Sequence, residues 1–76
     1  MQSRLLFDSA VAHFSEHVGP IADLLVEEAF AMVKLSRDSG ELSLQHQAAL
    51  KIFLRRQLPN DIDTSAVIRN IFSNLK

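Results

Sequence analysis

The sequence predicts an all-α fold, and more specifically a compact four-helix domain with short connections and the second helix at its centre. Only two glycines and two prolines interrupt the 76 residues. Leu, Ala, Glu, Lys, Gln and Met, which favour helices, recur throughout, and apolar residues repeat every three or four positions. A chain of this length makes one domain, so residues 1–76 are expected to form a single helical unit.

The first helix is expected over residues 3–18. Its apolar residues follow one another at intervals of four, three and four positions, as one face of a helix requires. These residues are Phe7, Val11, Phe14 and Val18. Ser3 is the expected N-cap. Gly19-Pro20 ends this helix and begins the next, because proline at the first helical position costs no hydrogen bond.

The second helix is expected over residues 20–36 and is apolar around most of its circumference. Neighbouring helices usually cover such a helix on all sides, which places it at the centre. Glu28 is the exception within its apolar sector. Since an unpaired buried charge is costly, we expect Glu28 to be partly buried and to pair with His46, Arg55 or Arg56.

The third helix is expected over residues 40–57, after the break at Arg37-Asp38-Ser39-Gly40. Asp38 and Glu41 have the spacing of a capping box. The expected apolar face has Leu50 at its margin and His46 in its middle. It consists of Leu42, Ala49, Ile52 and Phe53.

The fourth helix is expected over residues 63–75, following the turn Leu58-Pro59-Asn60-Asp61. Asp63 is the predicted N-cap, with Ile62 and Val67 spaced as a hydrophobic staple. The apolar face of this helix again repeats every three or four residues. It consists of Val67, Ile68, Ile71, Phe72 and Leu75.

Composition argues against several classes of function. With no cysteine, the chain has no disulfide and no zinc site of the usual structural kind, which fits a cytoplasmic protein. The net charge of −1 argues against nucleic acid and anionic membranes as partners. No apolar run reaches the ~18 residues of a membrane span. The N-terminal segment Met1-Gln2-Ser3-Arg4 is short and charged residues follow soon after it, which argues against a signal peptide.

His13-Phe14-Ser15-Glu16-His17 has the H-x-x-E-H spacing that binds zinc in one class of metalloprotease. Such an enzyme also needs a third ligand and a cleft that excludes water. Four short helices offer little room for a cleft, so we interpret the two histidines as surface residues. No catalytic residue, cofactor, metal or small-molecule substrate is predicted.

Lys51, Arg55 and Arg56, with Arg69 and Lys76, could form a basic patch. The corresponding alternative is a small helix-turn-helix-like DNA-binding regulator, whose second helix would place donors against base edges. A near-neutral domain lacks the charge expected for that function. We therefore interpret these cations mainly as a solvated face.

Val18-Gly19-Pro20-Ile21-Ala22, followed by Leu24-Leu25-Val26 and Ala29, resembles the "GPIA" and "LV" signature of a small helical domain appended to bacterial serine/threonine kinases and nucleotide cyclases. Phe53-Leu54 is similar to an "FL" pair in a later helix of that domain. The resemblance covers about Leu5 to Leu54 and departs from the signature at Glu27-Glu28, where basic residues are expected. It implies an accessory, non-catalytic signalling module and supplies no site residues.

These observations favour a protein–protein interaction or oligomerisation module, with a protein partner or a second copy in a homodimer. A helix this apolar, in a chain with few large polar residues to cover it, leaves apolar surface for a partner. The candidate partner contacts lie on flanks that a four-helix core can leave open. They are Leu5, Leu24, Glu28, Leu54 and Leu58.

Overall fold

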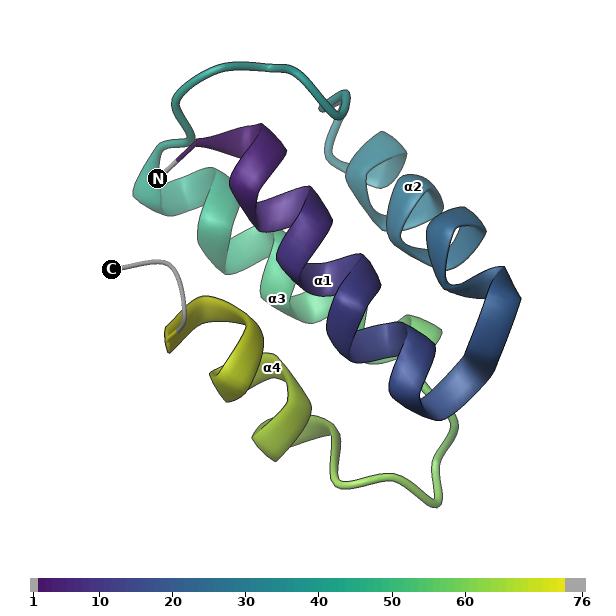
Figure 1. Ribbon diagram of the computed structural model, residues 1–76. Coiled ribbons are helices and arrows are strands. Elements are labelled where there is room, and N and C mark those ends of the chain that lie inside the picture. Colours follow the sequence, from purple (N-terminus) through teal and green to yellow (C-terminus); the bar gives the residue numbers. More distant parts are fainter. Residues whose placement is uncertain (1, 74–76) are drawn as a thin grey trace.

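The computed structural model describes residues 2–73 and confirms the all-α class. Helix α1 spans Ser3–Val18, α2 spans Ala22–Met32, α3 spans Leu44–Gln57 and α4 spans Thr64–Ser73 (Figure 1). A short 3-10 helix, η1 (Gly19–Ile21), joins α1 to α2. In residues 2–73 the extended pairing is limited to one isolated antiparallel bridge between Gln2 and Glu41.

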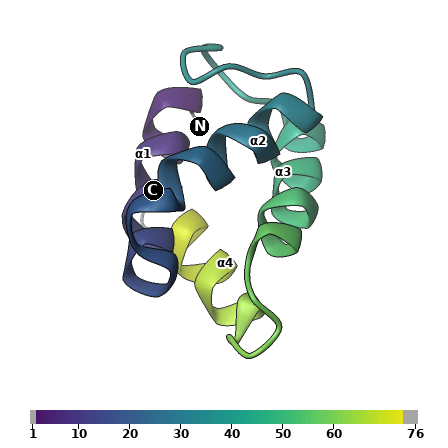
Figure 2. The same cartoon turned by 90° about the vertical axis from the view of Figure 1, so that its right-hand side faces the viewer.

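The helices surround a shared core. The backbone of α1 lies alongside α2 and α4, and that of α3 also lies alongside α2 and α4 (Figures 1 and 2). Consequently α1 faces α3, and α2 faces α4, across the middle of the molecule. The radius of gyration of 11.0 Å agrees with the value of about 11 Å expected for a compact chain of this length.

The prediction that the second helix is central is wrong. Helix α2 turns Ala22, Val26, Ala29 and Phe30 into the core, while Leu24 and Met32 are 66% and 57% exposed. Its apolar circumference suggested burial on all sides. Among the described residues, however, only α1, η1 and α3 pack against it, so its outer face stays open to solvent.

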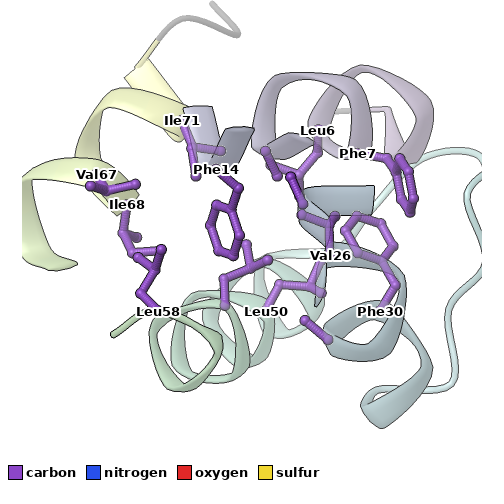
Figure 3. Packing of buried hydrophobic residues seen from close by; sticks show 14 of the residues in the cluster. Leu6, Phe7, Phe14, Val26, Phe30, Leu50, Leu58, Val67, Ile68 and Ile71 are labelled. Carbon is purple, nitrogen blue, oxygen red and sulfur yellow. The ribbon is translucent and has the colours of Figure 1, made fainter. Parts of the chain in front are cut away.

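The core joins all the helices through interlocking large side chains. Phe14 from α1 points between Leu50 of α3 and Ile71 of α4 (Figure 3). Phe7 and Phe30 meet edge to face, with their ring centroids 5.0 Å apart, which fixes α1 against α2. Ser9 adds a polar tie, since its hydroxyl donates to the carbonyl oxygen of Ile71 at 3.1 Å.

Helix α1 has the predicted bounds and α2 ends four residues before its predicted limit. The N–H of Leu35 donates to the carbonyl of Phe30, and the N–H of Lys34 donates to that of Ala31. Lys34 takes the left-handed conformation, with φ 59°. This is a Schellman termination in which lysine occupies the position that usually holds glycine.

The prediction that Ser3 is the N-cap of α1 is wrong. Ser3 is the first residue of the helix, and it is fully buried. Its hydroxyl lies 2.8 Å from the carbonyl oxygen of Ser36 and 3.2 Å from that of Arg37. Its N–H donates to the carbonyl of Gly40 at 2.7 Å. Ser3 therefore anchors the long connection between α2 and α3 rather than capping its own helix.

The start of α3 was also predicted wrongly. The helix begins at Leu44, with Ser43 as the N-cap that accepts from the N–H of His46. The Asp38–Glu41 capping box does not form, because those residues lie in the connection that Ser3 anchors. For α4, in contrast, the Asp63 cap is confirmed, since its carboxylate accepts from the N–H of Ala66 at 3.2 Å. Leu75 and Lys76 lie outside the described residues.

The apolar face predicted for α3 is correct in part, since Leu42 is buried and Phe53 packs against the core. Leu50 and Leu54 are fully buried, and Leu58 just beyond the helix continues the same line at intervals of four residues. Ile52, which was assigned to the core, is 55% exposed. Because Leu50, Leu54 and Leu58 fill the core, the neighbouring Ile52 is turned toward solvent.

Candidate functional site

The predicted partner contacts divide into exposed and buried residues. Leu5 on α1 and Leu24 on α2 are 55% and 66% exposed, so both are available to a partner. Leu54 and Leu58 are not available, because both lie in the core, where they pack among the helices. These two leucines belong to the structural interior, and they are removed from the candidate contacts.

Glu28 does not form the predicted buried pair. It is exposed, and no described residue gives it an ion pair or a hydrogen bond. His46 is also exposed, in the first turn of α3, and Arg55 and Arg56 are exposed farther along that helix. The prediction assumed that α2 is covered on every side; with its outer face open, Glu28 is hydrated and needs no partner.

The H-x-x-E-H segment does not form a metal centre with other described residues. His13 is half-buried, and its Nδ1 lies 2.9 Å from the carbonyl oxygen of Ser9, so that nitrogen carries a proton and donates. Glu16 and His17 are exposed. Within residues 2–73 no group of three or more His, Cys, Asp or Glu side chains is placed to hold a metal ion.

Sequence reasoning missed several exposed apolar side chains. Ile21 and Met32 were assigned to the covered part of the second helix and Ile52 to the core, and all three are about half exposed or more. Leu44 is 82% exposed at the first residue of α3. A signal for Ile52 was present, because the regular Leu50, Leu54, Leu58 spacing competes with it for the core.

A shallow groove of about 420 Å³ runs between α3 and α4. Ile68 and Phe72 supply its apolar surface, and three cations surround them: Lys51, Arg55 and Arg69. The Lys51 Nζ lies 4.9 Å from the centroid of the Phe72 ring, within cation–π range. Among residues 2–73 no acidic side chain lines the groove, so it suits an occupant that combines apolar surface with negative charge.

A second pocket, of about 340 Å³, lies between α1, α2 and the connection that follows α2. Phe7, Phe30 and Leu35 line it, together with Glu27 and Arg37. Arg37 is occupied within the molecule, because its guanidinium stacks 4.9 Å from the centroid of Phe7 and pairs with Asp8 at 3.0 Å. This pocket therefore has fewer cations available to a partner than the groove between α3 and α4.

The fold separates charges that nearly cancel in the whole chain. Helix α2 carries Asp23, Glu27 and Glu28 and no lysine or arginine. Helices α3 and α4 carry Lys51, Arg55, Arg56 and Arg69 and no aspartate or glutamate. The net charge of −1 thus conceals an acidic helix and a basic helix pair, which composition alone does not reveal.

None of the described helices has the length and apolar character needed to cross a membrane. Comparison of the chain with protein families, with curated proteins and with solved structures finds no match.

Proposed function

We propose that this all-α chain is a four-helix, non-catalytic module for protein–protein interaction, which associates with itself through the outer face of α2. The observation that carries the proposal is the exposure of large apolar side chains on that helix and at the end of η1, which precedes it. Ile21 is 49% exposed, Leu24 66% and Met32 57%, all within one short segment. Apolar residues grouped in this way commonly mark an interface.

Helical spacing brings these side chains together. Leu24 and Glu28 are four residues apart, as are Glu28 and Met32, and residues at that interval lie on the same side of a helix. Ile21 is three residues before Leu24 and extends the same surface. A partner would cover an apolar strip with an acidic residue in it. Leu5, on α1, is a further candidate contact outside this strip.

The lack of cysteine and the resemblance at Val18–Ala22 favour an accessory role in a cytoplasmic, bacterial signalling or regulatory protein. In that setting the module would bring copies of the signalling protein together. No cofactor or small-molecule substrate is part of this proposal.

Sedimentation equilibrium over a range of concentrations tests the proposal. We expect the wild-type chain to form dimers or larger species at tens of micromolar, and a double Leu24→Gln, Met32→Gln variant to be monomeric. Leu44→Gln is the control, because it removes a leucine that is even more exposed than Leu24 but lies on α3. A wild-type chain that stays monomeric throughout the range would refute self-association.

DNA binding is a second candidate, because every charged side chain on α3 and α4 is basic. Four cations on one helix pair could contact phosphates even though the whole chain is nearly neutral. Binding of a labelled DNA duplex at about 50 and 200 mM salt distinguishes the candidates, since phosphate contacts weaken steeply with salt. Strong binding that disappears at the higher salt concentration would favour this alternative.

A further inference from the structure

The groove between α3 and α4 carries positive charge that the molecule does not neutralise. No described residue forms an ion pair with Lys51, Arg55 or Arg69. Lys51 and Arg55 are four residues apart on α3, so the two like charges lie on the same side of the helix and repel. An acidic occupant would remove this repulsion.

The same groove has an apolar interior that water solvates poorly. Ile68 is 5% exposed and belongs to the core, whereas Phe72 is half-buried and packs against the edge of that core. Lys51 partly covers the Phe72 ring. An occupant that fits this groove therefore needs an apolar side chain for its interior and carboxylates for its rim.

The outer face of α2 has both of these properties. Leu24 is 66% exposed, and Glu27 and Glu28, three and four residues later, lie beside it on the same side of the helix. Asp23 and Glu27 are four residues apart and repel in the same way as the groove cations. None of the three acidic residues has an ion pair with a described residue.

We propose that the groove between α3 and α4 receives α2 of a second copy of this chain, with Leu24 directed at Ile68 and Phe72. Glu27 and Glu28 of that copy then approach Lys51, Arg55 and Arg69. Laying one helix into an apolar groove is a common mode of protein recognition. The charges of the two surfaces are complementary, and they set the orientation of α2 in the groove. The inference rests on the proposed function and specifies the contact.

The contact is head-to-tail, because the two surfaces differ and lie on different parts of the molecule. Helix α2 faces α4 across the core (Figures 1 and 2). The lining of the groove, in contrast, comes from α3 and α4. A pair formed in this way keeps one free α2 and one free groove. Such contacts extend into chains or close into rings instead of stopping at a symmetric dimer.

Two variants test the contact by complementation. Glu27→Gln with Glu28→Gln removes the acidic surface and keeps the groove, whereas Lys51→Gln with Arg55→Gln does the reverse. We expect each variant alone to associate at least about tenfold more weakly than the wild type, because each lacks one half of every contact. Mixed together, the two variants should form a one-to-one dimer and nothing larger. In that dimer the intact groove of one variant holds the intact α2 of the other, and the two surfaces that remain free are the substituted ones.

The controls remove charge elsewhere on the molecule. Glu16→Gln with Asp38→Asn removes two exposed acids that are not on α2, and Arg4→Gln removes an exposed cation from α1. Both controls should assemble like the wild type. Far-UV circular dichroism verifies that each variant is folded, and raising the salt from about 50 to 300 mM should weaken wild-type assembly, because salt screens exposed charges.

The outcomes separate this inference from the proposed function. If the wild type associates and Leu24→Gln with Met32→Gln prevents it, but the charge variants assemble normally, the head-to-tail contact is overturned and the module remains an oligomerisation domain. If the wild type is monomeric at every concentration and salt, both proposals fail. Binding of duplex DNA that depends on Lys51 and Arg55, with no self-association, would assign the groove to nucleic acid and also overturn the inference.

Discussion

The hydroxyl of Ser3, the first residue of α1, lies 2.8 Å from the carbonyl oxygen of Ser36, in the connection between α2 and α3. The two residues are 33 positions apart in the sequence. Together with the bond from the Ser3 N–H to the Gly40 carbonyl and the bridge between Gln2 and Glu41, this contact fastens the connection to the beginning of α1. The long segment without helix is thereby held in place by the Ser3 hydroxyl together with backbone groups.

Replacing Ser3 with alanine should lower the free energy of unfolding by about 0.5–1.5 kcal/mol, because the carbonyl groups of Ser36 and Arg37 lose a hydrogen-bond donor. Urea denaturation followed by circular dichroism measures the effect, since the chain has no tryptophan or tyrosine for fluorescence. Ser15→Ala is the control: the Ser15 hydroxyl is exposed and bonds only within its own helix, to Ala12. Equal effects of the two substitutions would contradict the anchoring role of Ser3.

Replacing Lys34 with glycine should raise the free energy of unfolding by about 0.5–1 kcal/mol. Lys34 has φ 59°, a conformation that is unfavourable for residues with a Cβ atom and free of strain for glycine. Lys34→Ala retains the Cβ and removes the charge, so it should give no such gain. Thermal or urea unfolding of the three proteins compares them directly, and a glycine variant less stable than wild type would show that the strain is absent.

Truncation of Leu54 and of Ile52 should have very different effects, although the residues are two positions apart. Leu54→Ala should cost about 2–5 kcal/mol of stability, because it leaves a cavity in the core where the side chain is fully buried. Ile52→Ala should change stability by only about 0.5 kcal/mol, since that side chain is 55% exposed. A larger loss of stability from Ile52→Ala than from Leu54→Ala would contradict this packing and would support Ile52 as a core residue.

Local signals predicted part of this fold well. The repeat of Phe7, Phe14 and Val18 followed by Gly19-Pro20 predicts the end of α1 at Val18 correctly. Asp63 acts as a cap because its side chain needs only an N–H three residues away. Such features depend on neighbouring residues along the chain, so a single sequence contains them.

The end of α2 and the packing of its outer face could not be predicted in the same way. Val33 and Leu35 continue the apolar pattern past the true end at Met32, and a lysine stands where a terminating glycine would have been recognisable. Whether Leu24 and Met32 are covered depends on which helices lie beside them. That is a property of the assembled fold, so the sequence indicated Leu24 as a candidate contact but not Met32.

The candidate groove was beyond sequence reasoning for a related reason. Lys51, Arg55 and Arg69 were recognised as a set of cations, but their association with Ile68 and Phe72 arises only when α3 and α4 pack together. The net charge also misled, because it averages an acidic helix with two basic ones. Charge has to be assigned to individual faces before it is informative about a partner.

The shortness of α4 has a consequence for dynamics. Within the part of the chain that the structure describes it spans Thr64–Ser73, and isolated helices below about 12–15 residues are marginal in water. Its helical state therefore depends on burying Val67, Ile68 and Ile71 against the other helices. Because α4 forms one wall of the groove, filling the groove and folding α4 are thermodynamically linked, and an occupant would slow hydrogen exchange along the whole of α4.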